Sequence, residues 1–194
     1  KDIEEAHKRI EPYIFKTPQI YSTPLSDNKM NVYLKLESMQ ITGSFKLRGA
    51  LNKLLNLDEK EKEKGVIAVS TGNHGKGVAY AAKKLGLKSK IFMSDLVPEH
   101  RRTAIENLGA EVVISGKNSD EADHNAREYS NKNKIPLIHP FDDEKIIAGQ
   151  GTIGLEMFEN LPSIDTVIVP TSGGGLIGGI AIALKNHNPD LNAN

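Results

Sequence analysis

The sequence predicts an α/β fold with parallel-rich β-sheets in two domains, and three observations lead to this prediction. From residue 65 onward, short apolar segments alternate with segments of helical periodicity. The apolar segments show little polar alternation, which is typical of parallel strands that are covered on both faces and joined by right-handed crossovers. The rhythm is interrupted at Asp58–Lys64 and again near His139-Pro140. We therefore expect a smaller domain over residues 66–141 and a larger one that joins residues 1–57 to residues 142–194.

The first 57 residues lie outside the alternation of strands and helices. A short helix is expected over Asp2–Ile10 and should end near Pro12, because proline lacks the N–H that would continue it. Val32–Leu36 alternates like a strand, and Phe45–Leu57 has the periodicity of a helix. The run Asp58–Lys64 alternates in charge, which indicates a solvated helix end or a connector between domains.

From residue 65 onward, each predicted strand is a short apolar run, and Pro136 weakens the fourth of them. The strands cover residues 65–70, 90–93, 111–114, 135–138 and 166–169. Helical spacing of apolar residues predicts the helices between them, with Pro98 as a favourable first-turn residue and Ser119 as the expected N-cap of the third. The helices cover residues 73–85, 98–108, 119–131, 142–161 and 176–186.

Composition excludes several classes of protein. The 25 Lys and Arg residues balance the 25 Asp and Glu residues, so no overall positive field attracts nucleic acid or anionic lipid. The sequence has no cysteine, which excludes disulfides, thiolate nucleophiles and cysteine-based metal sites and is compatible with a reducing cytoplasm. No apolar run approaches the roughly 18 residues of a membrane span. We expect a cytoplasmic protein with a small-molecule substrate.

A glycine-rich loop follows the last predicted strand. Ser172–Leu176 contains three consecutive glycines before a helix, and successive N–H groups at such a place suit a phosphate. The spacing Gly173-x-Gly175-x-x-Gly178 also matches a dinucleotide motif, which leaves an NAD-dependent dehydrogenase as an alternative. Gly149-x-Gly151-x-x-Gly154 matches the same motif, but no acidic residue ends the following strand. We expect this second set of glycines to serve close helix packing.

Two further segments carry chemistry-bearing residues. Ser70–Gly75 lies at the end of the first apolar strand and the start of its helix, where hydroxyls and free N–H groups suit a carboxylate; a capped turn is the alternative. Lys46 lies between Phe45 and Leu47 at a predicted helix start. Apolar neighbours and a positive helix end disfavour its ammonium form and favour an amine nucleophile, whereas an ordinary surface lysine is the alternative.

Together, Ser44–Ala50, Ser70–Gly75 and Ser172–Leu176 resemble, in order and spacing, the serine/threonine dehydratase and serine racemase family. The joining segments His139–Asp143 and Ile147–Thr152 are similar to this family as well, so the resemblance covers nearly the whole chain. Its members use pyridoxal 5′-phosphate (PLP) and have the tryptophan-synthase-β-like fold type II. The resemblance thus implies PLP as the cofactor and a small hydroxy-amino acid as the substrate.

The resemblance also implies roles for individual residues. Lys46 would hold PLP covalently and then take the Cα proton of the substrate, with Phe45 packed beside the cofactor ring. Asn73 would hydrogen-bond the 3-oxygen of the ring. The cofactor phosphate would lie against Ser172, Gly173, Gly174, Gly175 and Leu176. The substrate carboxylate would bind Ser70, Thr71, Gly72, Asn73 and His74. None of these residues is expected to bind a metal.

The implied activity is that of an ammonia-lyase, which converts L-threonine, L-serine or a related hydroxy-amino acid to a 2-oxo acid and ammonia. Serine racemases of the family carry serine at position 71 and typical threonine dehydratases carry alanine, so Thr71 leaves a racemase with side elimination activity as an alternative. Neighbouring residues resemble the dehydratases linked to hydroxyectoine breakdown. A non-catalytic binding fragment with the same fold is an alternative from another class.

Members of the family continue well beyond this length. The additional residues are expected to supply the partner of the pyridine nitrogen, the divalent-cation ligands and the rest of the larger domain's sheet. We therefore expect the chain to lack the C-terminal part of the larger domain. The full-length protein is expected to form a homodimer or homotetramer.

Overall fold

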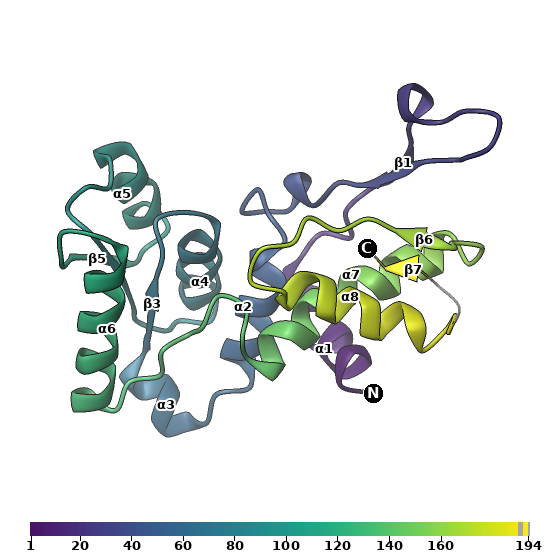
Figure 1. The fold of residues 1–194 in the computed structure, drawn as a ribbon. Coiled ribbons are helices and arrows are strands. Elements are labelled where there is room, and N and C mark those ends of the chain that lie inside the picture. The colour runs from purple at the N-terminus through teal and green to yellow at the C-terminus, as the bar shows by residue number, and fades with distance from the viewer. Residues whose placement is uncertain (190–191, 194) are drawn as a thin grey trace.

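The computed structural model describes residues 1–189 and 192–193. Strand β3 and helices α4, α5 and α6 lie at one end of the molecule, and α1, α7 and α8 lie at the other, with α2 between them (Figure 1). Strand β1 belongs to an arm that projects away from the second half (Figure 1). In the part of the chain that the structure describes, no helix has the length and apolar character of a membrane span.

The N-terminal region combines short helices with an antiparallel hairpin. Helix α1 (Asp2–Ile10) has the predicted bounds, and a 3₁₀ turn (Glu11–Tyr13) containing Pro12 follows it. Strands β1 (Gln19–Tyr21) and β2 (Tyr33–Lys35) pair antiparallel, which confirms a strand within Val32–Leu36. Two further 3₁₀ turns cover Thr23–Leu25 and Glu37–Met39.

Helix α2 (Lys46–Leu55) confirms the predicted helix and is two residues shorter at its C-terminus. The charge-alternating run becomes the short helix α3 (Glu59–Lys64), because Asp58 and Glu61 form a capping box at its start. No residue of α3 is buried, as expected for a solvated connector.

The next segment forms a three-stranded parallel sheet with the order β3-β4-β5. Its strands are β3 (Val66–Val69), β4 (Ser89–Met93) and β5 (Glu111–Ile114), and helices α4 (Asn73–Lys84), α5 (Glu99–Glu106) and α6 (Ser119–Asn133) connect or flank them. The predicted fourth strand is reduced to a single parallel bridge between Ile67 and Leu137. Pro136 accepts a hydrogen bond from the Ile67 N–H but has no N–H to extend the pairing.

The predicted cap of helix α6 is wrong by one residue. Asn118, not Ser119, is the N-cap, and its side chain accepts a hydrogen bond of 2.9 Å from the Glu121 N–H. Both residue types cap helices well, but Asn118 has the extended backbone of a cap and Ser119 is already helical.

The remaining elements lie at the other end of the molecule. They are α7 (Glu144–Asn160), β6 (Thr166–Val167), α8 (Gly175–Lys185) and β7 (Asn192–Ala193), with β6 and β7 paired in parallel. The predicted strand over 166–169 is shorter, and the Ile168 side chain is 85% exposed. Strands β3 and β6 belong to different sheets. This separation agrees with the proposed division into two domains, which stays a prediction.

The glycines of α7 lie at helix contacts, as expected. A Cβ atom on Gly149 would lie 2.6 Å from the Cα of Gly49 in α2, and one on Gly151 would lie 2.8 Å from the carbonyl oxygen of Gly179 in α8. Helix α7 therefore packs closely against α2 on one side and α8 on another. This confirms the packing interpretation and places these glycines away from any strand end.

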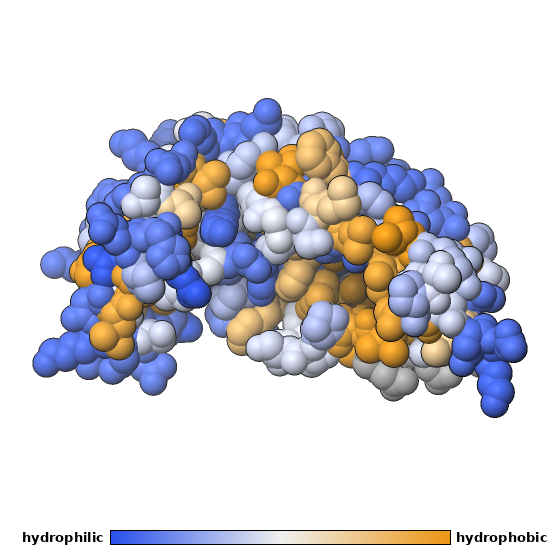
Figure 2. All heavy atoms as spheres, turned by 90° about the horizontal axis from the view of Figure 1, so that it is seen from above, coloured by the Kyte–Doolittle hydropathy of each residue, from blue (hydrophilic) through white to orange (hydrophobic). Residues whose placement is uncertain are grey.

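Apolar surface is unevenly distributed. Figure 2 shows apolar side chains gathered over the half that holds α7, α8 and the hairpin, whereas the half that holds the three-stranded sheet is mostly hydrophilic on this face. In the half that holds α7, α8 and the hairpin, the exposed apolar side chains include Ile20, Tyr21, Leu25, Leu34, Ile168 and Ile182. Single exposed apolar residues are ordinary, whereas contiguous apolar patches are typical of interaction surfaces.

Candidate cofactor site

Lys46 is the first residue of helix α2 and lies in a half-buried place. Its ammonium group donates a hydrogen bond of 2.7 Å to the carbonyl oxygen of Pro140 and lies 5.2 Å from the centre of the Phe45 ring. Burial lowers the pKa of Lys46, and no carboxylate in the described part of the chain opposes this effect. The environment therefore favours the neutral amine, which is the nucleophilic form.

His74 belongs to helix α4, and its buried ring lies near Lys46 of helix α2. Its Nε2 lies 2.9 Å from the carbonyl oxygen of Ile138, and because a carbonyl oxygen only accepts, Nε2 carries the hydrogen. Burial lowers the pKa of His74 to about 4, against the opposing effect of this hydrogen bond, and the charges of Lys46 and His139 lower it further. His74 is neutral near pH 7, and its side chain is committed to Ile138.

The segment before His74 leaves the start of helix α4 open. Gly72 is the N-cap and makes no side-chain capping bond, while its own N–H donates to the Ser70 hydroxyl at 3.1 Å. Thr71 is half-buried and Asn73 is exposed. The main-chain N–H groups in the first turn of an uncapped helix suit an anion such as a carboxylate.

The structure explains why each of the three residues of the loop is a glycine. A Cβ atom on Gly173 would lie 2.3 Å from the ring of Phe141, and one on Gly175 would lie 2.6 Å from the carbonyl oxygen of Phe141. Gly174 has φ +86 and is the N-cap of helix α8, which also begins without a side-chain cap. The loop is thus an open helix start that is pressed against Phe141, while Ser172 lies exposed at its edge.

One segment, residues 138–141, connects the three predicted sites. The carbonyl of Ile138 binds His74, the carbonyl of Pro140 binds Lys46, and Phe141 lies against Gly173 and Gly175. The structure thereby brings together an amine of lowered pKa and two open helix starts. This arrangement suits a ligand with an aldehyde at one end and a phosphate at the other, and PLP fits that description.

The carbonyls of Ile138 and Pro140 were not predicted from the sequence. A main-chain acceptor has no side-chain signature, and the one signal was the position of His139-Pro140 at the end of a weak strand. Arg48 was also missed, although it stands two residues after Lys46. Its signal is that a charged residue lies among Leu47, Ala50 and Leu51 on the buried face of α2.

Comparison with known proteins gives one family and several relatives. A family model described as "Pyridoxal-phosphate dependent enzyme" matches residues 10–193. The catabolic L-threonine dehydratase TdcB of Staphylococcus aureus strain USA300 is 50% identical over 192 residues, which are 98% of this chain and 56% of that protein. The chain therefore spans about half the length of the curated relatives it matches.

Two solved structures are similar over nearly the whole chain. The processed form of threonine deaminase isoform 2 from Solanum lycopersicum has a TM-score of 0.94 and 41% identity, covering 98% of this chain and 52% of that one. Maize serine racemase has a TM-score of 0.93 and 38% identity, covering 98% of this chain and 58% of that one.

Proposed function

The chain belongs to the family of pyridoxal-phosphate-dependent enzymes, and from this premise we propose that the whole protein is a PLP-dependent ammonia-lyase. Its substrate is L-threonine, L-serine or a related hydroxy-amino acid, and its products are a 2-oxo acid and ammonia. The observation that carries the proposal is the meeting of Lys46, the α4 start and the glycine loop at residues 138–141. The expected fold type II is confirmed by the two solved relatives.

The residues present fit PLP. Lys46 provides an amine with a lowered pKa. Gly173 and Gly175 let the loop lie close to Phe141, and helix α8 begins there without a side-chain cap. Its first main-chain N–H groups are therefore available as a cradle that binds the phosphate. Ser172 and Leu176 flank this cradle, and the Phe45 ring lies next to the Lys46 amine. When bound, PLP supplies an electron sink for the charge that develops at Cα.

Lys46 is the proposed general base. Its neutral Nζ takes the Cα proton of the substrate, the Cβ–hydroxyl bond breaks, and the hydroxyl leaves as water after it gains a proton. Hydrolysis of the resulting unsaturated amino acid then gives the 2-oxo acid and ammonia. The lowered pKa of Lys46 serves this step because more of the amine is unprotonated near neutral pH.

The start of helix α4 is the proposed carboxylate site. Ser70, Thr71, Gly72 and Asn73 offer hydroxyl, amide and main-chain groups there, and Asn73 is also the proposed partner of the 3-oxygen of PLP. His74 contributes its main-chain N–H, because its ring is buried against Ile138. The proposal therefore gives the main chain of His74, and not its ring, to the substrate carboxylate.

The proposal is tested with full-length protein and three substrates: L-threonine, L-serine and threo-3-hydroxyaspartate. We expect release of a 2-oxo acid and ammonia in equal amounts from at least one of them, in a reaction that requires PLP. Absence of both products from all three substrates, despite bound PLP, would favour a non-catalytic protein of the same fold.

Serine racemisation is the second candidate activity, and Thr71 is the observation that favours it. The side chain of Thr71 retains a hydroxyl at the start of α4, and maize serine racemase has a similar fold. Racemisation needs an acid on the face of Cα opposite Lys46, whereas elimination proceeds with Lys46 alone. Both enantiomers of serine should therefore be followed together with pyruvate.

We further propose a cytoplasmic location and a homodimeric or homotetrameric assembly of the whole protein. The absence of cysteine is compatible with a reducing compartment. The exposed apolar side chains around the hairpin and α8 are compatible with contacts that this stretch of chain does not itself complete. Sedimentation of the full-length protein distinguishes dimer from tetramer.

A further inference from the structure

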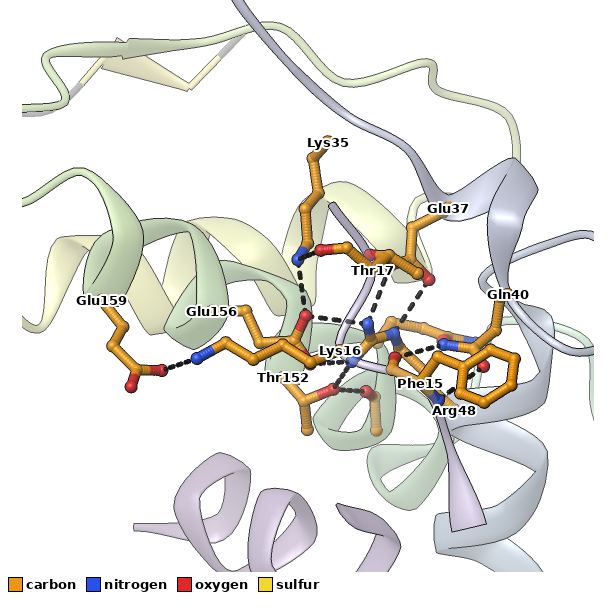
Figure 3. Close-up of polar contacts among 12 residues, drawn as sticks. Phe15, Lys16, Thr17, Lys35, Glu37, Gln40, Arg48, Thr152, Glu156 and Glu159 are labelled. Atoms are coloured by element: carbon orange, nitrogen blue, oxygen red, sulfur yellow. Dashed lines mark hydrogen bonds and ion pairs between the residues drawn. The ribbon is translucent and has the colours of Figure 1, made fainter. Parts of the chain in front are cut away.

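Arg48 is fully buried two residues after Lys46, and every one of its N–H groups has a partner (Figure 3). Its Nε and one terminal nitrogen donate to the two carboxylate oxygens of Glu37 at 2.9 and 2.8 Å. The two terminal nitrogens donate to the carboxylate of Glu156 at 2.6 and 3.0 Å, and one of them also reaches the Thr152 hydroxyl at 3.1 Å. The guanidinium group has five N–H donors, and these five bonds use all of them.

The surrounding charges balance. Lys35 forms an ion pair of 2.6 Å with Glu156 and donates to the Thr17 carbonyl, and the Thr17 hydroxyl donates to Glu37. Two cations thus face two carboxylates in a buried place. Although burial alone would raise the pKa of Glu156, its bonds with Arg48 and Lys35 outweigh this effect and lower it. We name Arg48, Glu37, Glu156 and Lys35 the charge cluster.

The charge cluster joins three parts of the chain that are distant in sequence. Glu37 follows the hairpin, Arg48 lies in α2, and Glu156 lies in α7 (Figure 3). At the other end of the α2–α7 contact, Lys53 pairs with Asp143 at 2.6 Å. Helix α2 is therefore fixed to α7 near both of its ends.

Helix α7 also leads directly to the acceptor of Lys46. Its N-cap, Asp143, follows the segment that contains Pro140 and Phe141. The contact between α2 and α7 thus links the helix that carries Lys46 to the segment that holds its acceptor, Pro140, and Phe141 beside the glycine loop. A planar guanidinium bound by two carboxylates fixes direction as well as distance, which a lysine in its place would not do.

We propose that Arg48, held by Glu37 and Glu156, is a positioning residue for Lys46. This inference rests on the proposed function of Lys46 and adds that the charge cluster determines where the amine stands. Displacement of a reacting group by about 1 Å costs on the order of 10²-fold in rate. The hydrogen bonds of the charge cluster do not reach helix α4, where the carboxylate site lies, so loss of the cluster should affect kcat far more than KM.

The test separates positioning from folding with full-length protein carrying PLP. Glu156→Gln leaves the buried Lys35 without a carboxylate partner and Arg48 with Glu37 alone. It should lower the melting temperature by about 10 °C. The double variant Arg48→Met/Glu37→Met removes one charge of each sign and keeps the ion pair of Lys35 with Glu156. Such apolar replacement of a buried ion pair often restores stability. Glu159→Gln is the matched control, because Glu159 lies on the same helix in an exposed pair with Lys16.

We expect the double variant to melt close to the wild-type temperature while kcat stays about 10²-fold lower and KM changes by less than about threefold. The rate at which added PLP develops visible absorbance with the apo protein should fall as well. Glu159→Gln should match the wild type in melting temperature, kcat, KM and rate of PLP attachment.

A stable double variant with wild-type kcat and a wild-type rate of PLP attachment would overturn the inference. If the double variant does not fold, Arg48→Lys decides between the outcomes, because lysine retains the charge but cannot bind two carboxylates through a planar guanidinium group. A lowered kcat at constant KM supports positioning, and an unchanged kcat overturns it. Failure of the wild-type protein itself to attach PLP contradicts the proposed function instead.

Discussion

Lys46 and Arg48 are two cations on one helix, two residues apart, in opposite environments. Lys46 has one carbonyl acceptor and lies over the ring of Phe45, and burial lowers its pKa. Arg48 is more deeply buried, yet its bonds with Glu37 and Glu156 outweigh the effect of burial, and its pKa is raised. Burial alone therefore does not determine the state of a buried cation; the presence of a carboxylate partner does.

This difference gives the two residues different functions: Lys46 can react, and Arg48 holds the helix in place. A cation without a counter-charge is poised to lose its proton and to react. A cation with two counter-charges is fixed in place, and removal of one partner is costly. Substitution of Lys46 should therefore act mainly on activity, and loss of one partner of Arg48 should act mainly on stability.

Lys46→Ala should have the largest effect on activity and little effect on folding. It removes both the group that binds PLP and the general base, so ammonia release should fall by roughly 10³-fold or more. Thermal unfolding should change little, because Lys46 has no charged partner to leave behind. Lys62→Ala, in the exposed helix α3, is the control. Near-normal ammonia release from Lys46→Ala would defeat the assignment.

Glu156→Gln, in contrast to Lys46→Ala, should lower the free energy of unfolding strongly. It leaves Arg48 and Lys35 with one carboxylate fewer, and breaking such a buried pair costs about 3–5 kcal/mol in the free energy of unfolding. Glu159→Gln, on the same helix, should lie within the error of a denaturant titration, because its pair with Lys16 is exposed. Equal effects of the two substitutions would remove the distinction between buried and exposed pairs.

His74 extends the comparison to a second buried base without a counter-charge. Its pKa is lowered from 6.5 to about 4, so the unfolded chain binds more protons between these two values. Stability should therefore fall as the pH drops below about 6.5 and should stop falling on this account near pH 4, a loss of about 3 kcal/mol at most. His74→Gln should flatten this part of a stability–pH profile, whereas His124→Gln, at an exposed site, is the control. An unchanged slope in His74→Gln would be incompatible with a buried neutral ring.

Gly174→Val should weaken PLP binding through the backbone. No atom lies within 4 Å of a Cβ at this position, so the expected cost comes from φ +86. A branched residue in the left-handed region costs about 1–2 kcal/mol, or roughly tenfold in the Kd for PLP. Gly178→Ala is the matched control, since its Cβ would also meet open space and its φ is not positive. Equal Kd values for both variants would count against the phosphate cradle.

Thr71→Ala should have the smallest effect on elimination. L-serine elimination should stay within about tenfold of wild type, or about 1.4 kcal/mol, because Lys46 alone removes the proton. D-serine formation should disappear if the Thr71 hydroxyl is the acid on the opposite face. Chiral chromatography of serine together with a pyruvate assay measures both reactions. Equal racemisation by wild type and variant would exclude Thr71 from this role.

Local patterns made most of the fold predictable from the sequence. Helix α1 and strand β5 have the predicted bounds, and the apolar face of α1 is buried as its periodicity predicts. Strand β5 is less covered than its apolar sequence suggests, because it lies at the edge of the three-stranded sheet. The α6 cap was misplaced because Asn118 and Ser119 are adjacent and both suit a cap. The fourth strand was overestimated because Pro136 limits the pairing to one bridge.

The candidate site was predictable only where side chains carry the signal. Lys46, the glycine loop and the Ser70–His74 segment have residue types that indicate their chemistry. The acceptor carbonyls of Ile138 and Pro140 have no such signature. The bonds of Arg48 with Glu156 join positions 108 residues apart, and no spacing in a single sequence predicts that contact.

The residue that binds PLP can be identified directly. Borohydride reduction of the full-length protein, followed by proteolysis and mass spectrometry, fixes the cofactor to the lysine that holds it. We expect the added phosphopyridoxyl mass on the peptide that contains Lys46 and on no other. The same mass on a different lysine, or its absence from a protein that has bound PLP, would contradict the assignment of Lys46.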